Sequence, residues 1–357
     1  MPPILLNPGP VNVSARVRDA LNGPDICHRE SEFFDLQDAI RARLLDAFDV
    51  SSDYTSVLLT GSGTAMVEAM ITSAIPDGGR LLVVQNGTYG ERIAKIAELH
   101  RIHRDIIACS PIQRPDLTAI GDRLGAERYD ALAVVHHETT TGLINEIGPM
   151  AEICRRHGVP VLVDAVSALG GEPFDFAAWK PEAVACTSGK CVQGYPGLSF
   201  ALVRRDFMKR MTGHPERSLY FHLPRHFAEQ EKRSTPFTPA VQVAYALRAA
   251  IDELCDETVA VRIARYGRGT AIIRRGLTGL GLELLLPQEL RSNTLTSVKL
   301  PLSVPYATLH DALKRSGFVI YAGQGVFAAH AFRVAAMGDV AEADYRRFVA
   351  TLGAVVA

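Results

Sequence analysis

The sequence predicts an α/β protein in which a mostly parallel sheet lies between helices, followed by a smaller α+β unit. Short apolar segments alternate with longer segments of helical period as far as residue 203, which is typical of a doubly wound sheet. The short segments are apolar at consecutive positions, as expected for strands that helices bury on both faces. The pattern changes after residue 203, and this change predicts the second unit.

The elements of the sheet follow in order along the chain. The predicted strands are β-branched or leucine-rich runs, several of which end near glycine or small polar residues. They cover residues 55–61, 80–87, 103–109, 131–139, 159–167, 181–190 and 197–203. The predicted helices between them cover residues 64–75, 89–100, 117–127 and 148–158, the last of which ends at Gly158.

The rest of the chain is predicted to be irregular at first and then α+β. Residues 205–236 are polar and predicted irregular, and 239–254 form a helix with an apolar stripe. Beyond residue 259 we expect helix, strand 293–300, helix 306–317, strands 318–323 and 330–338, and helix 340–356. This division predicts a large domain of residues 15–254 and a small domain of residues 1–14 and 255–357.

Composition excludes several classes of protein. A 47% hydrophobic and 22% charged chain is globular rather than disordered. The 38 Lys and Arg residues against 39 Asp and Glu give a net charge of -1, so no overall basic field favours nucleic acid or membrane. The start of the chain lacks a signal-peptide pattern, and the six cysteines form no CxxC pair. We therefore expect a cytoplasmic protein without a metal site.

Polar residues at predicted strand ends are the candidate site, because ligands bind beyond the carboxyl ends of such a sheet. The segment Thr60-Gly61-Ser62-Gly63-Thr64 joins a strand to a helix, where backbone N–H groups and hydroxyls can bind phosphate. A plain capped turn is the alternative. Asp164 ends a very apolar strand, so it needs a cation or a donor, or else caps a helix.

Lys190 completes the candidate site. It follows the strand 181–190 between small residues, where apolar surroundings can lower its pKa and make it a Schiff-base nucleophile, although most lysines are solvated. Sites that bind pyridoxal 5′-phosphate (PLP) combine three features: a phosphate-binding turn, a carboxylate for the protonated ring nitrogen, and a lysine for the aldehyde. The three residue groups together therefore predict PLP as cofactor.

Further strand ends carry supporting residues. Tyr89 can stack on the cofactor ring, or it is a surface aromatic in a turn. His136 and His137 invite a metal interpretation, but neighbouring strand residues point to opposite faces. We therefore predict that Thr139 donates a hydroxyl to the cofactor. Arg333 lies among apolar residues, which predicts a fork for a carboxylate or phosphonate, or a structural ion pair.

These segments resemble the fold-type I, class V aminotransferases, the group that contains the alanine–glyoxylate transaminases. Within this group the sequence is most similar to the 2-aminoethylphosphonate–pyruvate transaminases, and the similarity runs nearly end to end. It rests on the combination of ETTTG, VDAVS and KCVQGYPG, with LLNPGPV, TSVLLTGSGTAMVEA, VVQNGTYGERI and FRVAAMGDV. Two positions depart from the pattern: Gly189 replaces an amide side chain before the lysine, and Val-Ala-Ala-Met-Gly follows Arg333.

The resemblance implies a role for each matching residue. Lys190 and Asp164 would be catalytic, and Arg333 and Gly9 would bind the substrate. The large domain would bind PLP, and the small domain would be the α+β unit. The protein would be a homodimer with shared active sites, in which Thr238 reaches the cofactor phosphate of the neighbouring subunit. The cofactor-binding residues implied are Ser62, Gly63, Thr64, Tyr89, Thr139, Asp164, Val166, Lys190 and Thr238.

The implied reaction is the transfer of an amino group from 2-aminoethylphosphonate to pyruvate, giving phosphonoacetaldehyde and alanine. A small amine and a keto acid would then be the partners. Three alternatives remain open at this point: an alanine–glyoxylate or serine–glyoxylate transaminase, a PLP-dependent lyase on a related amine, and a non-enzymatic paralogue with a degraded site. Intact Lys190 and Asp164 argue against the last of these.

Overall fold

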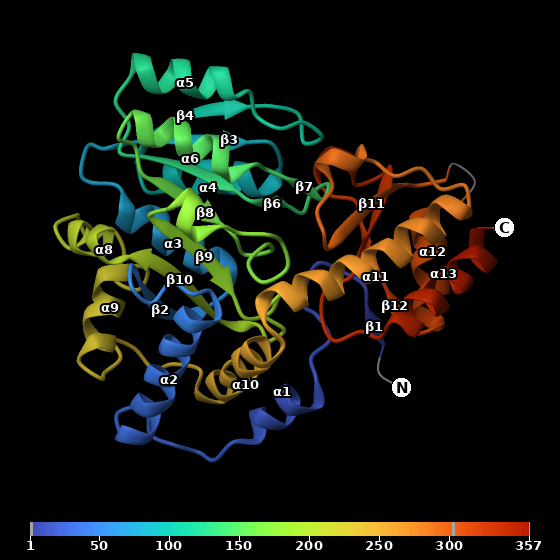
Figure 1. The fold of residues 1–357 in the computed structure, drawn as a ribbon, viewed down its shortest axis with the longest axis horizontal. Coiled ribbons are helices and arrows are strands. Elements are labelled where there is room, and N and C mark those ends of the chain that lie inside the picture. The colour runs from blue at the N-terminus through green and yellow to red at the C-terminus, as the bar shows by residue number, and fades with distance from the viewer. Residues whose placement is uncertain (1–2, 302–303, 357) are drawn as a thin grey trace.

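A seven-stranded sheet forms the centre of the large part of the computed structural model, which describes residues 3–301 and 304–356 (Figure 1). Six strands run parallel, and β10 runs antiparallel to both of its neighbours. In spatial order the strands are β2 (Tyr54–Gly61), β10 (Gly197–Arg204), β9 (Ala183–Thr187), β8 (Val161–Asp164), β5 (Ala131–Val135), β3 (Arg80–Gln85) and β4 (His103–Ala108).

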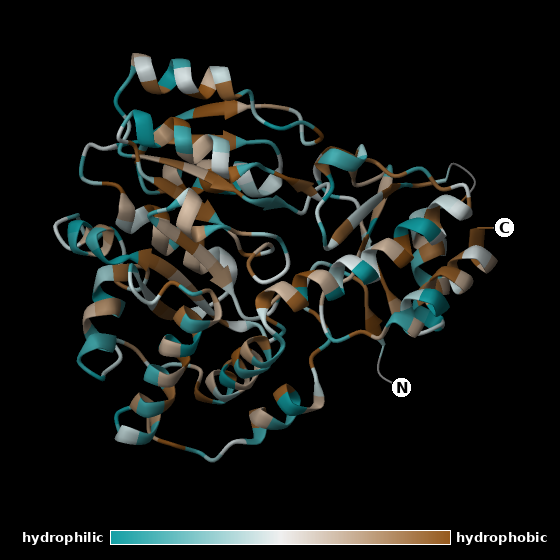
Figure 2. Ribbon diagram, in the orientation of Figure 1, coloured by the Kyte–Doolittle hydropathy of each residue, from teal (hydrophilic) through white to brown (hydrophobic). Residues whose placement is uncertain are grey.

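Helices cover both faces of this sheet. Successive strand residues point to opposite faces: Leu82 packs into one core cluster and Leu81 and Val83 into the other. Figure 2 accordingly shows the central strands as largely hydrophobic. One face is covered by α2 (Ser31–Ala47), α5 (Leu117–Ala126), α6 (Ile147–Arg156) and α10 (Val241–Glu257), the other by α3 (Gly63–Ala74), α4 (Thr88–Leu99), α8 (Arg205–Met211) and α9 (Leu223–Glu231).

The C-terminal part lies to one side of the sheet, with α11 (Val259–Gly279) leading into it (Figure 1). Its strands β11 (Leu295–Lys299), β14 (Ala331–Ala335) and β13 (Tyr321–Ala322) form an antiparallel sheet. The helices α12 (Tyr306–Arg315) and α13 (Glu342–Val356) share a core cluster with it. The N-terminal strand β1 (Ile4–Leu5) pairs with β12 (Phe318–Val319). The boundaries of the two predicted domains stay a prediction.

Three predicted elements differ from the structure. Residues 205–236 are not irregular, because they contain α8 and α9, whose apolar residues Phe207, Met208 and Leu223 pack against the sheet. The strand predicted for 131–139 ends at Val135, and His137–Glu138 (β6) pairs with Leu143–Ile144 (β7) instead. Residues 318–323 divide between β12 and β13, which belong to different sheets.

Short elements complete the described chain. These are α1 (Ala15–Asp19), α7 (Phe176–Trp179) and the 3₁₀ turns Ala20–Asn22, Gln288–Leu290 and Gly325–Phe327. None of the helices in residues 3–301 and 304–356 is long and apolar enough to cross a membrane.

Candidate active site

A cavity of about 240 Å³ opens at the carboxyl edge of the sheet. The parallel strands β2, β8 and β9 all end at this edge, so the polar residues that follow them meet there. Seven of the predicted site residues line the cavity: Gly9, Ser62, Gly63, Thr64, Tyr89, Val166 and Lys190. The convergence brings together segments from five separate regions of the chain.

Lys190 lies in the turn that follows β9, and the N-terminal segment packs against its side chain. Its Nζ donates a hydrogen bond to the carbonyl oxygen of Pro8. Gly9 has a φ of 105°, a conformation that favours glycine, and a Cβ atom there would lie 2.5 Å from Cδ of Lys190. Burial lowers the pKa of Lys190 to about 8, which raises the fraction of neutral, nucleophilic amine at physiological pH.

Asp164 is the last residue of β8 and is 7% exposed. Its Oδ1 accepts a hydrogen bond from the backbone N–H of Val166 at 3.0 Å. No helix begins there, so the alternative of a helix cap does not apply. Within the described residues no basic side chain lies within ion-pair distance, and burial raises its pKa to about 6. The carboxylate therefore lacks the cationic partner that a protonated ring nitrogen would supply.

Asp164→Asn is expected to stabilise the cofactor-free protein, and more so at higher pH. The ordinary pKa of an aspartate such as Asp164 is near 3.8, and in the folded protein it is about 6. Between pH 3.8 and pH 6 the folded state therefore binds more protons than the unfolded state. The free energy of unfolding of the wild type therefore falls as the pH rises through this range. Asparagine does not ionise, so the variant avoids this loss of stability, and its side-chain oxygen still accepts the hydrogen bond from the N–H of Val166. The gain over wild type in unfolding free energy should grow by about 1–2 kcal/mol between pH 5 and pH 8.

Denaturant titrations of the cofactor-free protein at the two pH values measure this change. Asp206→Asn is the matched control, because Asp206 is an exposed residue of α8. A stability difference between wild type and Asp164→Asn that is the same at pH 5 and pH 8 would show that the carboxyl is not held in an unfavourable ionised state.

Ser62, Gly63 and Thr64 form the predicted phosphate-binding turn, here called the phosphate cup. Ser62 is the N-cap of α3, and its hydroxyl accepts from the N–H of Ala65 at 3.4 Å. A Cβ at Gly63 would lie 2.6 Å from a methyl carbon of Val166, so glycine is needed for the packing of these two segments. The start of α3 thus directs N–H groups and its partial positive charge into the cavity.

Tyr89 lies in the first turn of α4 and is positioned by Glu138, a residue whose role the sequence did not reveal. The backbone N–H groups of Tyr89 and Gly90 donate to Oε2 of Glu138 at 3.2 and 3.3 Å. Glu138 is fully buried, and Gly87 is needed beside it because a Cβ there would lie 2.3 Å from the carboxylate carbon. The carboxylate therefore anchors the start of α4 and with it the tyrosine ring.

Thr139 and Arg333 lie together, although the sequence separates them by 194 residues. Nη1 of Arg333 donates to the carbonyl oxygen of Thr139 at 2.8 Å, and its Nε donates to Ala322. Arg333 is 6% exposed and forms no ion pair within the described residues, which contradicts the structural ion-pair alternative. The buried hydroxyl oxygen of Thr139 has no hydrogen-bond partner there, so it can bond a ligand.

The two histidines before Thr139 are not arranged as metal ligands. The His136 ring packs edge-on against Phe174 and Trp179, whereas Nδ1 of His137 lies 3.0 Å from the carbonyl oxygen of Ser167. Burial lowers the pKa of His136 to about 3 and that of His137 to about 4. Among the residues that the structure describes, no three His, Cys, Asp or Glu side chains group as a metal site.

Like Thr139 and Asp164, Thr238 does not line the Lys190 cavity. It is exposed and lines a different cavity, together with Thr60, Tyr220 and Phe237. Its predicted contact is with the phosphate of a neighbouring subunit. A single chain does not test that contact, and the role of Thr238 stays a prediction.

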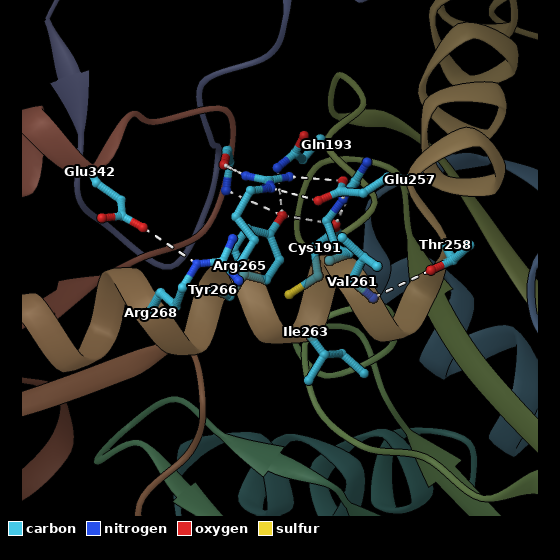
Figure 3. Close-up of polar contacts among 12 residues, drawn as sticks. Cys191, Gln193, Glu257, Thr258, Val261, Ile263, Arg265, Tyr266, Arg268 and Glu342 are labelled. Carbon is cyan, nitrogen blue, oxygen red and sulfur yellow. Dashed lines mark hydrogen bonds and ion pairs between the residues drawn. The ribbon is translucent and has the colours of Figure 1, made fainter.

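A buried network from α11 holds the loop that follows Lys190 (Figure 3). Tyr266 donates its hydroxyl to the carbonyl oxygen of Cys191 at 3.0 Å, and Nε2 of Gln193 donates to Tyr266 at 2.7 Å. Arg262, which is 1% exposed, donates to the same carbonyl and pairs with Glu257. Helix α11 thus fixes the loop that carries the lysine, a connection that sequence spacing alone gave no reason to expect.

The residues present fit PLP. Asp164 lacks a cationic partner, and the Thr139 hydroxyl lacks any partner within the described chain. The phosphate cup points donors into the cavity, and Lys190 carries an amine whose pKa is lowered. Each of these groups is matched by one part of the cofactor: the ring nitrogen, the ring hydroxyl, the phosphate and the aldehyde.

Comparison with known proteins agrees with this chemistry. The chain matches the family model "Aminotransferase class-V" over residues 19–338. It is 36% identical to the 2-aminoethylphosphonate–pyruvate transaminases of Syntrophobacter fumaroxidans (98% of this chain, 95% of the relative) and Vibrio cholerae (98% and 96%). The crystal structure of alanine–glyoxylate aminotransferase from Nostoc sp. superposes with a TM-score of 0.94 at 26% identity, covering 100% of this chain and 96% of that one.

These matches confirm the predicted family, its fold and its cofactor. The match to the family model spans most of the chain, and both relatives are covered almost completely. These matches, together with a cavity whose residues suit PLP, exclude the alternative of a non-enzymatic protein. The chain belongs to the class-V aminotransferases and is a PLP-dependent enzyme of that family.

Proposed function

We propose that this aminotransferase moves the amino group of 2-aminoethylphosphonate to pyruvate, giving phosphonoacetaldehyde and alanine. The names of the two relatives, which match over nearly their whole length, support this substrate pair. The observation that carries the proposal is Arg333: a buried guanidinium without an acidic partner in the described residues, close enough to Lys190 to lower its pKa. Such a cation suits a substrate that carries an anion.

Different residues in and beside the cavity would bind different parts of PLP. The phosphate cup would hold the phosphate, Tyr89 and Val166 would contact the two faces of the ring, and Thr139 would bond the ring hydroxyl. Asp164 would keep the ring nitrogen protonated. When bound, PLP supplies an electron sink for the charge that develops on the substrate carbon.

Lys190 has two roles in this proposal. Its amine binds the cofactor covalently between turnovers, and when the substrate amine displaces it, the freed Nζ takes the proton from the carbon that bears the amine. A lysine with a pKa of about 8 is suited to accept a proton near neutral pH. Gly9 and Pro8 pack along the side chain and limit where Nζ can move.

A panel of amine donors tests the substrate. We expect 2-aminoethylphosphonate to convert the cofactor to its amine form with a larger kcat/KM than alanine, serine or ethylamine, followed through the absorption change. The cofactor amine should then be consumed by pyruvate faster than by glyoxylate. If alanine or serine with glyoxylate gives the highest kcat/KM, the glyoxylate-type alternative replaces the proposal; ammonia release without any keto acid would favour a lyase.

We also propose that the enzyme is a homodimer that acts in the cytoplasm. The exposed position of Thr238, outside the Lys190 cavity, supports the expectation that it serves a neighbouring subunit. Sedimentation equilibrium should give twice the chain mass of 38.8 kDa. A monomeric, fully active enzyme would remove the proposed role of Thr238.

A further inference from the structure

We propose that Arg92 is the cationic residue of the phosphate site, and that it binds the phosphate of PLP together with the phosphate cup. This inference rests on the proposed placement of the cofactor phosphate at Ser62, Gly63 and Thr64. It adds a residue that neither the sequence motifs nor the resemblance singled out.

The position of Arg92 in α4 directs it toward the cup. It follows Tyr89 by three residues, so both side chains leave the same face of the helix. The centre of its guanidinium lies 4.6 Å from the centroid of the Tyr89 ring. Nη1 donates a hydrogen bond to Oγ1 of Thr64 at 2.9 Å. The arginine therefore joins the cup to the ring predicted to stack on the cofactor.

The guanidinium of Arg92 has no anionic partner in the part of the chain that the structure describes. No carboxylate lies within 4.0 Å of Arg92 among residues 3–301 and 304–356, although other arginines such as Arg80 and Arg104 are paired with acids. Arg92 lines the cavity itself and lies near enough to act on the pKa values of Asp164 and Lys190. A cation that lines a cavity without a counter-ion is suited to receive an anion from solution.

The other walls of the cavity explain why Arg92 is needed. The described lining contains no acid and only one other cation, Lys190, whose amine is committed to the cofactor aldehyde. Gly189 contributes no side chain, and a Cβ there would lie 3.0 Å from Pro196. A phosphate that carries up to two charges would otherwise face only hydroxyls, N–H groups and the start of α3. Arg333, another buried arginine without an ion pair in the described residues, contacts Thr139 rather than the cup.

The test compares PLP with pyridoxal, which lacks the phosphate. Binding to the cofactor-free enzyme is followed by quenching of its intrinsic fluorescence, without any measurement of turnover. We expect wild type to bind PLP far more tightly than pyridoxal. Arg92→Gln should weaken PLP binding about 10- to 100-fold, the loss of a charge-assisted hydrogen bond, and leave pyridoxal binding nearly unchanged. Arg92→Lys should recover part of the affinity for PLP.

Lys95→Gln is the matched control, because it removes one positive charge from the exposed side of the same helix, where Lys95 pairs with Glu98. It should leave both affinities at the wild-type values. Equal losses for PLP and pyridoxal in Arg92→Gln would overturn the proposal and assign the arginine to support of Tyr89. Unchanged PLP binding with a raised KM for the amine would overturn it in favour of a substrate contact. If wild type itself does not discriminate the two ligands, the phosphate placement is wrong.

Discussion

Lys190→Ala is expected to lower the rate of amine-to-cofactor transfer by at least about 10⁴-fold, because it removes both the covalent attachment and the group that moves the proton. Lys190 is the only lysine that lines the cavity among the described residues, so no other side chain can replace its amine there. The variant should still bind PLP non-covalently through the cup and Asp164. It should lack the visible absorption band of the lysine-bound cofactor.

Single-turnover mixing of the cofactor-loaded enzyme with 2-aminoethylphosphonate measures this rate. Lys209→Ala is the control, because Lys209 is a largely exposed lysine that pairs with Asp206. Addition of a small primary amine such as methylamine should restore part of the lost rate, since it can carry the proton. A variant that keeps a rate within tenfold of wild type would contradict the assignment of Lys190.

Arg333→Ala is expected to raise KM for 2-aminoethylphosphonate by roughly 30-fold to several thousandfold, equivalent to about 2–5 kcal/mol for a buried charge-assisted contact. Cofactor affinity should change little, because Arg333 contacts the carbonyl oxygen of Thr139 rather than its hydroxyl, and the phosphate cup, Asp164 and Lys190 are all retained. The side chain also donates to Thr139, Ala322 and Gln324, so the variant loses structural hydrogen bonds as well.

Ethylamine, which lacks the phosphonate, separates recognition of the anion from this structural loss. If Arg333 binds the phosphonate, kcat/KM for ethylamine should be nearly the same in wild type and variant. Arg346→Ala, at an exposed arginine of α13, provides the matched control. A similar loss for both amines would show that Arg333 only supports the site.

The large sheet could be predicted from the sequence because its signals are local. Each buried strand is a continuous apolar run, and Ser62, Asp164 and Lys190 all lie at or just beyond the carboxyl end of one. Parallel strands share an edge, so three positions distant in sequence had to converge once the fold was inferred. The strand ends therefore predicted that Lys190 and Asp164 lie at one site, and the resemblance implied their catalytic roles.

What the sequence did not reveal depends on contacts between distant segments. The role of Glu138 in holding α4 becomes evident only from the structure, in which the N–H groups at the start of that helix donate to its carboxylate. Arg262 and Tyr266 lie about 70 residues beyond the lysine loop that they hold. From the sequence, Arg92 cannot be distinguished from other arginines of amphipathic helices; only the structure shows that it has no counter-ion among the described residues. Polar composition likewise concealed α8, which is stabilised by Phe207 and Met208 against the sheet.

Borohydride reduction followed by peptide mass mapping identifies the lysine that binds the cofactor. Reduction fixes the imine between a lysine and PLP as a stable amine, so the modified lysine can be identified after proteolysis. We expect the pyridoxyl phosphate mass on a single peptide, the one that contains Lys190, and no label when the cofactor is omitted. Label on another lysine, or none on Lys190 in an enzyme saturated with PLP, would show that Lys190 does not bind the cofactor.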